Sequence, residues 1–166
     1  MKIAIISDTH GNVKNFKKVL SWLDKENIKV VLHCGDIGSP ESFKESLEGF
    51  DGEFYGVLGN MDKDYKLDLK EYQAYNVKVN EELAEITIAG KKIALIHKPD
   101  RNKELAESGK YDFVFYGHTH KPWEEKIGQC RVINPGESAG QIFKPTFAVY
   151  DFGNDKLELK IIEMLG

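Results

Sequence analysis

The chain has 166 residues, of which 41% are hydrophobic and 30% charged, and its formal net charge is −4. This length and composition predict a single domain, residues 1–166, with a full core, and they exclude a disordered chain and a membrane protein. No apolar run reaches about 20 residues, so we expect no membrane span, and we also expect no secretory leader and no disulfide framework from the two cysteines. We therefore expect a cytoplasmic protein with no membrane partner and no overall attraction to nucleic acid.

Strands and helices alternate through the first part of the chain. Continuous apolar runs are typical of strands buried on both faces, and three occur, at 2–7, 30–33 and 53–58. Asn12 can cap a helix over 13–26, where apolar residues recur at helical spacing. Ser39 and Pro40 begin a second helix, which Gly49 closes.

The rest of the chain is predicted to be mostly strands. The polar residues 61–72 hold either a short helix or a loop, and a helix near 101–108 ends at Gly109. Strands are predicted at 76–80, 82–89, 92–96, 112–116, 123–127, 130–133, 146–152 and 156–162. The pattern therefore predicts a layered α/β domain whose C-terminal half is rich in strands.

Five short segments directly follow predicted strands and carry side chains that ligate metals. They are Asp8-Thr9-His10, Gly35-Asp36, Gly59-Asn60-Met61-Asp62, His97 and Gly117-His118-Thr119-His120. Ligands gather at the carboxyl ends of strands in α/β sheets, so these segments are expected to meet. Their nitrogen and oxygen donors suit Mn, Fe, Co, Ni or Zn, and seven donors are too many for one ion and fit two. We expect the glycines before Asp36, Asn60 and His118 to allow sharp turns of the backbone.

This ordered set of motifs resembles the calcineurin-like metallophosphoesterases, and more narrowly the small single-domain phosphodiesterases of the YfcE type. That group shares its fold with a eukaryotic retromer subunit. The resemblance covers essentially the whole chain and implies a four-layer α/β/β/α sandwich with a metal site at the C-terminal ends of strands. It also implies hydrolysis of phosphodiester bonds by a hydroxide that bridges two divalent metal ions. Mn²⁺ is the expected ion, with Ni²⁺, Fe²⁺, Co²⁺ and Zn²⁺ as alternatives.

Matching by position implies seven metal ligands: Asp8, His10, Asp36, Asn60, His97, His118 and His120. Asp8, His10 and His120 match the ligands of the first ion, and Asp36 matches the carboxylate shared by both ions. Asn60, His97 and His118 match the ligands of the second ion. Asp36, Asn60 and His118 are expected to act in catalysis, whereas Asp62 matches an acidic position outside the ligand set.

The chain departs from the family pattern in three places. Met61 stands where many relatives have a histidine that protonates the leaving group, although the small phosphodiesterases usually lack that histidine too. Lys98 stands where relatives usually have glycine. Glu137 follows the segment 134–136, where serine normally comes next.

Several interpretations stay open at this point. The whole protein is either the enzyme, a protein-interaction scaffold as in the retromer subunit, or a metal-stabilised protein without turnover. Lys98 and Arg101 lie either in a solvated loop or against a substrate phosphate. Nucleic acid enters only as a candidate substrate, and a homodimer is the assembly that base rates favour.

Four further side chains are interpreted as structural. His33 is expected to support the site rather than to bind metal, and Cys34 to be a small buried side chain. Phe143 and Phe147 are expected to be core or subunit contacts rather than a platform on which bases stack.

Overall fold

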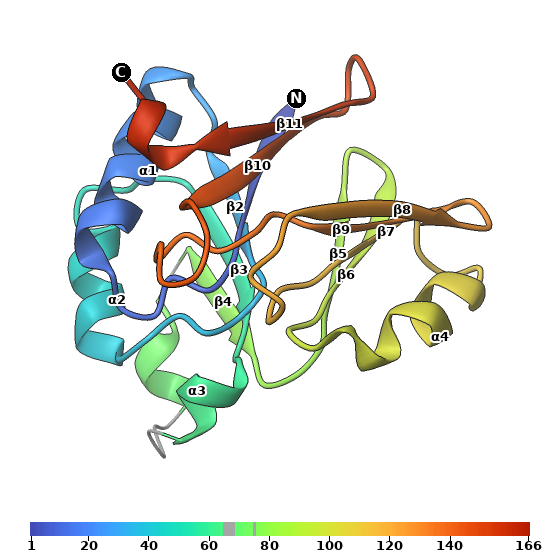
Figure 1. Cartoon of the computed structure of the whole chain (residues 1–166), viewed down its shortest axis with the longest axis horizontal. Helices are drawn as coiled ribbons and strands as arrows, with labels where there is room; N and C mark the ends of the chain where they lie inside the picture. Colours follow the sequence, from blue (N-terminus) through green and yellow to red (C-terminus); the bar gives the residue numbers. More distant parts are fainter. Residues whose placement is uncertain (65–68, 75) are drawn as a thin grey trace.

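Two β-sheets pack face to face, with helices on both outer sides (Figure 1). The computed structural model describes residues 1–64, 69–74 and 76–166. Helices α1 and α2 lie on the left of this view and α4 on the right, with the two sheets between them. The predicted four-layer α/β/β/α sandwich is therefore confirmed.

The first sheet has six strands in the order β11-β10-β1-β2-β3-β4. Strands β1 to β4 run parallel to one another, and β10 pairs antiparallel with both β1 and β11. The bounds are β1 Lys2–Ile6, β2 Val30–His33, β3 Glu53–Val57, β4 Val77–Asn80, β10 Thr146–Asp151 and β11 Lys156–Ile161. Because β1, β2 and β3 are parallel, the loops that follow them open at one edge of the sheet.

The second sheet has five strands in the order β5-β6-β7-β9-β8. Its three central strands are parallel, and an antiparallel strand lies at each edge. The bounds are β5 Ala84–Ile88, β6 Lys91–Leu95, β7 Phe113–Phe115, β8 Trp123–Ile127 and β9 Cys130–Asn134.

The helices begin where the sequence predicts caps. In α1 (Val13–Lys25) the Asn12 side chain accepts a hydrogen bond from the backbone N–H of Asn15. In α2 (Pro40–Leu47) the Ser39 hydroxyl accepts one from Ser42 N–H. These bonds satisfy amides that have no partner within the helix. The remaining helices are α3 (Asn60–Asp64), α4 (Asn102–Glu107) and 3₁₀ segments at Leu69–Tyr72, Pro99–Arg101 and Ile162–Met164.

Alternation along the strands divides the apolar side chains between layers. In β1, Ala4 and Ile6 face α1 and α2, whereas Ile3 and Ile5 face the second sheet. The core between the sheets includes Ile3, Ile5, Leu32, Ile93, Leu95, Phe113 and Phe115. A third cluster packs Leu105 and Ala106 of α4 on the second sheet. Strands buried on both faces explain the continuous apolar runs in the sequence.

Element boundaries differ from the predictions by one or two residues. The polar segment 61–72 is a short helix followed by a 3₁₀ turn, and its residues 65–68 lie outside the described part of the chain. Cys34 and Cys130 are buried and unpaired, as expected. Within the described residues, no helix has the length and apolar character needed to cross a membrane.

Candidate metal centre

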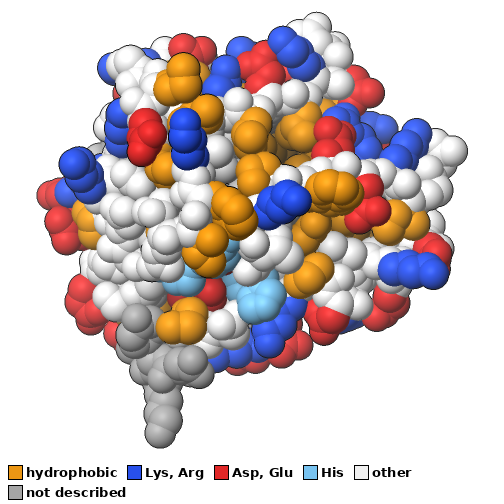
Figure 2. Space-filling view, viewed as in Figure 1, with side chains coloured by type: hydrophobic (Ala, Val, Ile, Leu, Met, Phe, Trp, Pro, Cys, Tyr) orange, Lys and Arg blue, Asp and Glu red, His pale blue; other side chains and the backbone are white. Residues whose placement is uncertain are grey.

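The five predicted segments meet along the seam between the two sheets. Asp8 and His10 follow β1, Asp36 follows β2, and Asn60 follows β3, all in the first sheet. The other three side chains, His97, His118 and His120, follow β6 and β7 of the second sheet. Figure 2 shows histidine side chains gathered with acidic atoms at one place on this face, with apolar side chains beside them.

One group consists of Asp8, His10 and His120, whose ligand atoms lie within 4.8 Å of one another. The Nε2 atoms of the two histidines are 3.3 Å apart, and His120 Nε2 is also 3.3 Å from Asp8 Oδ1. Asp8 Oδ2 accepts hydrogen bonds from the Ser7 hydroxyl at 2.6 Å and from His118 N–H at 3.1 Å. Asp8 Oδ1 is buried without a hydrogen-bond partner, so it is free to bind an ion.

Asp36 lies between two histidines that come from different sheets. Its Oδ1 accepts a hydrogen bond from Met61 N–H at 2.9 Å. Its Oδ2 is 3.8 Å from His10 Nε2 and 3.5 Å from His97 Nε2. Burial raises the pKa of Asp36, but the hydrogen bond and charge of His97 together hold it below its usual value. One carboxylate oxygen therefore faces both His10, from the first sheet, and His97, from the second.

The His97 ring is fixed in one tautomer by its surroundings. Its Nδ1–H donates to the Cys34 carbonyl at 2.8 Å, so in the neutral ring Nε2 carries the lone pair. This Nε2 lies 3.0 Å from the Asn60 side chain, at the atom assigned as Oδ1. Burial lowers the pKa of His97, but the hydrogen bond and charge of Asp36 raise it above its usual value. Two acceptors that face each other are stabilised only by a proton or a cation between them.

His118 is the most exposed of the predicted ligands. Its ring lies 5.1 Å from the His97 ring in an edge-to-face arrangement. Burial and the neighbouring charge of His97 lower the pKa of His118. Neither of the two compact ligand groups in the described residues includes it. Its side chain therefore stands at the open side of the centre.

The backbone at the site adopts an uncommon conformation. Five predicted ligands have positive φ angles between 45° and 69°: Asp8, His10, Asp36, His118 and His120. Only three other non-glycine residues in the described part of the chain do so. This region of φ and ψ is costly for side chains with a Cβ and is typical of functional loops.

Glycines precede three of the candidate ligands, and two of them leave room for a carboxylate to pack against the backbone. Of the three glycines that precede candidate ligands, only Gly35 has a positive φ, at +92°. A Cβ on Gly59 would lie 1.9 Å from Asp36 Oδ1, and one on Gly117 would lie 1.9 Å from Ser7 Oγ and 2.7 Å from Asp8 Oδ2. At Gly59 and Gly117, the absence of a side chain lets a carboxylate approach the backbone closely.

Two buried polar side chains, Asp62 and His33, contact the loops that carry the candidate ligands. Asp62 accepts hydrogen bonds from three backbone amides, those of Ile37, Gly38 and Gly59, at 2.8–3.0 Å. It therefore ties the loop after β2 to the loop after β3. His33 is fully buried and contacts Thr9 Oγ1 at 3.0 Å, which places it outside both ligand groups.

Comparison with known proteins identifies the family. Residues 1–155 match the calcineurin-like phosphoesterase superfamily domain. The chain belongs to this superfamily. It is 34% identical to a phosphodiesterase of Methanocaldococcus jannaschii over 156 residues, which cover 91% of this chain and 93% of that protein. The prediction of a calcineurin-like phosphoesterase is confirmed.

Solved structures of the superfamily agree with this fold. A structure described as a novel archaeal phosphodiesterase is 30% identical with a TM-score of 0.86, and the match covers 97% of this chain and 99% of that one. The phosphoesterase YfcE of E. coli is 17% identical with a TM-score of 0.67, over 98% and 100% of the two chains. Vps29 of Entamoeba histolytica in complex with Zn²⁺ is 20% identical with a TM-score of 0.68, over 98% and 99%. At these identities the last two matches show the fold alone.

The donor set of this phosphoesterase fits divalent cations. Nitrogen ligands about 2.1 Å from an ion lie roughly 3.0–3.4 Å apart, which is the separation of His10 Nε2 and His120 Nε2. Asp8 Oδ1, which has no hydrogen-bond partner, is a further atom that could bind an ion, and Asn60 Oδ1 and His97 Nε2 lie 3.0 Å apart, close enough to share one. The donor chemistry also matches the preference of first-row transition metals for imidazole and carboxylate.

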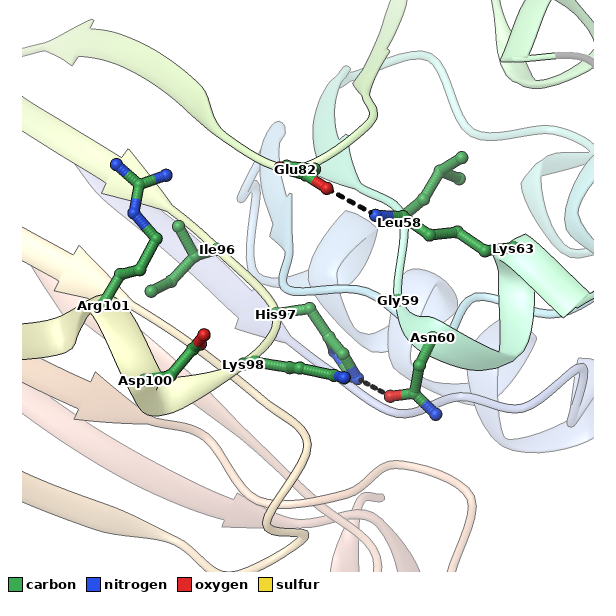
Figure 3. Close-up of a pocket in the computed structure, with 10 residues that line it drawn as sticks. All are labelled: Leu58, Gly59, Asn60, Lys63, Glu82, Ile96, His97, Lys98, Asp100 and Arg101. Atoms are coloured by element: carbon green, nitrogen blue, oxygen red, sulfur yellow. Dashed lines mark hydrogen bonds and ion pairs between the residues drawn. The ribbon is translucent and has the colours of Figure 1, made fainter.

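A cavity of about 290 Å³ adjoins the Asn60 side of the centre in this phosphoesterase. Figure 3 shows the Lys98 side chain pointing toward the His97–Asn60 pair. Lys63 is paired with Glu82 at 2.8 Å and Arg101 with Glu104 at 3.2 Å. Lys98 also lines the cavity and has no ion pair among the described residues. Lys98 therefore keeps a free ammonium group beside the candidate centre, and Arg101 is engaged elsewhere.

The burial of the remaining side chains singled out in the sequence differs from one to the next. Phe147 is fully buried in the core, whereas Phe143 is 47% exposed and lies outside the core, so for Phe143 the expected subunit contact stays a prediction. Cys34 is buried, and burial raises its pKa far above the usual value. Sequence reasoning noted Glu137 only as a departure from the family pattern. The structure buries it completely, with Oε2 3.4 Å from His120 Nδ1.

Proposed function

We propose that this phosphoesterase is a metal-dependent phosphodiesterase with two divalent cations, and that Mn²⁺ is its ion. The observation that carries the proposal is Asp36 Oδ2, which faces His10 on one side and His97 on the other. A carboxylate in that position can be shared by two ions. The proposed ligands are the seven predicted from the sequence: Asp8, His10, Asp36, Asn60, His97, His118 and His120. The 34% identity to a named phosphodiesterase supports the choice of diesters.

The residues around the proposed metal centre have separate roles in the reaction. When bound, two cations would supply a bridging hydroxide as nucleophile and would neutralise charge on the phosphate oxygens. The Met61 N–H holds Asp36 Oδ1 and so fixes the orientation of the shared carboxylate. The exposed His118 stands where it can contact the substrate phosphate. Met61 is 40% exposed and has no proton to donate, so departure of the leaving group depends on its own acidity.

Lys98 extends the proposed site beyond the ligands. Its free ammonium lines the cavity next to Asn60 and supplies a positive charge toward the substrate phosphate. This assignment favours substrate contact over the alternative of a purely solvated loop. With Arg101 paired to Glu104, the phosphate would be held by the metal ions and by lysine.

A protein-interaction scaffold remains the alternative function. Vps29 proteins share the fold at 17–21% identity, and one such structure contains Zn²⁺. The unpaired Asp8 Oδ1 and the convergence of Asn60 on His97 favour the enzyme, because a contact surface needs no such arrangement. A cytoplasmic location and a homodimer stay predictions.

The deciding experiment measures metal content and turnover on the same preparation. Protein treated with EDTA is reloaded with Mn²⁺, and hydrolysis of bis(4-nitrophenyl) phosphate is compared with that of 4-nitrophenyl phosphate. We expect two bound ions per chain, no turnover without metal, and faster cleavage of the diester. Turnover that persists without metal would refute the dinuclear enzyme. Tight binding of two ions without turnover of either ester would favour the scaffold.

A further inference from the structure

Glu137 is a fully buried carboxylate in the loop between β9 and β10. Its Oε2 accepts a hydrogen bond from Gln141 N–H at 2.8 Å. Its Oε1 accepts two more, from Ile142 N–H at 2.7 Å and Phe143 N–H at 2.5 Å. Burying a carboxylate is costly unless such partners compensate for the lost water. This side chain therefore determines the local course of the loop at 141–143.

The loop has little else to hold it in place there. Ile142 is 68% exposed and Phe143 47% exposed, so their side chains contribute little burial. The start of the loop is attached to the metal centre, since Ala139 N–H donates to the Asp8 carbonyl at 3.0 Å. The three amides bound to Glu137 thus lie two to four residues after Ala139, which is hydrogen-bonded to the backbone of a predicted ligand.

Glu137 also faces the far side of the His120 ring. Its Oε2 is 3.4 Å from His120 Nδ1, and that nitrogen is buried without a hydrogen bond in the structure. The opposite ring nitrogen, Nε2, points at Asp8 Oδ1 and His10 Nε2. If Nε2 binds an ion, the ring must carry its proton on Nδ1, where Glu137 stands as the acceptor.

We propose that Glu137 is a positioning residue that holds His120 with Nε2 toward the metal and couples metal binding to the order of the 141–143 loop. This inference rests on the proposed metal centre. A cation on Nε2 fixes the proton on Nδ1 and makes this N–H a stronger donor to Glu137 Oε2, so the carboxylate that accepts the three loop amides is held in one position. Coupling between two sites is reciprocal, so an ordered loop must in turn favour metal binding.

Amide hydrogen exchange on the unmodified protein tests the coupling directly. We expect Mn²⁺ to slow exchange at Gln141, Ile142 and Phe143 relative to EDTA-treated protein. The Gly153 amide, which the Asp151 carboxylate anchors in the β10–β11 turn at 2.9 Å, serves as the internal control and should not change. Equal exchange at 141–143 with and without Mn²⁺ would overturn the inference.

Mn²⁺ titration of variants tests the positioning role. We expect Glu137→Gln to weaken Mn²⁺ binding by about 10–100-fold, as is typical for partners of ligating histidines. Asp151→Asn removes another loop-anchoring carboxylate and should leave the affinity unchanged. If Glu137 is purely structural, Glu137→Gln lowers the melting temperature but leaves Mn²⁺ affinity at the parent value, and that result would contradict the proposal. If the parent itself binds no Mn²⁺, the proposed function fails rather than this inference alone.

Discussion

His33 should make the folded state lose stability as the pH falls below about 6.5. The ring is fully buried, and its Nδ1 accepts a hydrogen bond from Gly35 N–H at 3.2 Å. Its Nε2–H therefore donates to Thr9 Oγ1 at 3.0 Å, and the Thr9 hydroxyl donates onward to the Ile37 carbonyl at 2.9 Å. A second proton on Nδ1 would face the Gly35 N–H. The structure thus accepts only neutral His33.

The direction and size of the effect follow from proton linkage. Burial lowers the pKa of His33 from 6.5 to about 3. Above pH 6.5 both states carry a neutral ring, and between pH 6.5 and 3 only the unfolded chain binds the proton. The contribution is therefore present above the unfolded pKa and is lost at about 1.4 kcal/mol per pH unit as the pH falls. At pH 5 the loss is about 2 kcal/mol, a large share of a typical domain stability.

Urea unfolding in EDTA at pH 7, 6 and 5, followed by tryptophan fluorescence, measures this slope. The variant His33→Asn keeps an acceptor for Gly35 N–H and does not titrate. All other groups are common to both proteins, so the difference between their curves isolates His33. We expect the parent to lose about 2 kcal/mol more than the variant between pH 7 and pH 5. Parallel curves would refute the reasoning, whatever the constant offset between the two proteins.

Four further changes test the site. Asp36→Asn should release metal at both positions and lower kcat/KM by more than about 100-fold, beyond the effect of an outer partner; metal analysis that still finds two tight ions would contradict the shared carboxylate. Met61→His should speed cleavage of substituted phenyl diesters with poor leaving groups by up to about 10²-fold and flatten the dependence of rate on leaving-group pKa; an unchanged slope would mean that another group donates the proton. Gly59→Ala should lose metal and about 1–3 kcal/mol of stability in urea, because its Cβ would overlap Asp36; Gly153→Ala is the control. Lys98→Met should raise KM about fivefold with little change in metal content. An unchanged KM would mean that Lys98 lies in a solvated loop and does not contact the substrate.

The sequence predicts the elements well because their signals are local. Buried strands read as apolar runs, and Asn12 and Ser39 lie at helix starts where their caps are needed. The positions of the candidate ligands follow from the same logic, since each stands directly after a strand and parallel strands end at one edge.

The contacts that sequence reasoning missed are non-local. Nothing near Gly59 in the chain indicates that Asp36, 23 residues earlier, will pack against it. Likewise, the sequence around Glu137 indicates only a charged loop residue, and its place beside His120 depends on where β9 ends. Phe143 looks like a core residue by type, but hydrogen bonds from three backbone amides to Glu137 hold its segment where the side chain is exposed. These outcomes depend on how loops from two sheets pack together.

The candidate ligands come from both sheets, and this gives a bound ion a mechanical role. The sheets share no hydrogen-bonded strand pair among the described residues and are joined chiefly by the apolar layer between them. An ion held by Asp8 and His120 would cross-link residues 112 positions apart in the sequence. The unfolded chain does not hold these ligands together, so the free energy of ion binding would add to the stability of the folded state, and chelation would remove it. Without the ion, the two sheets would be held together chiefly by the apolar layer between them.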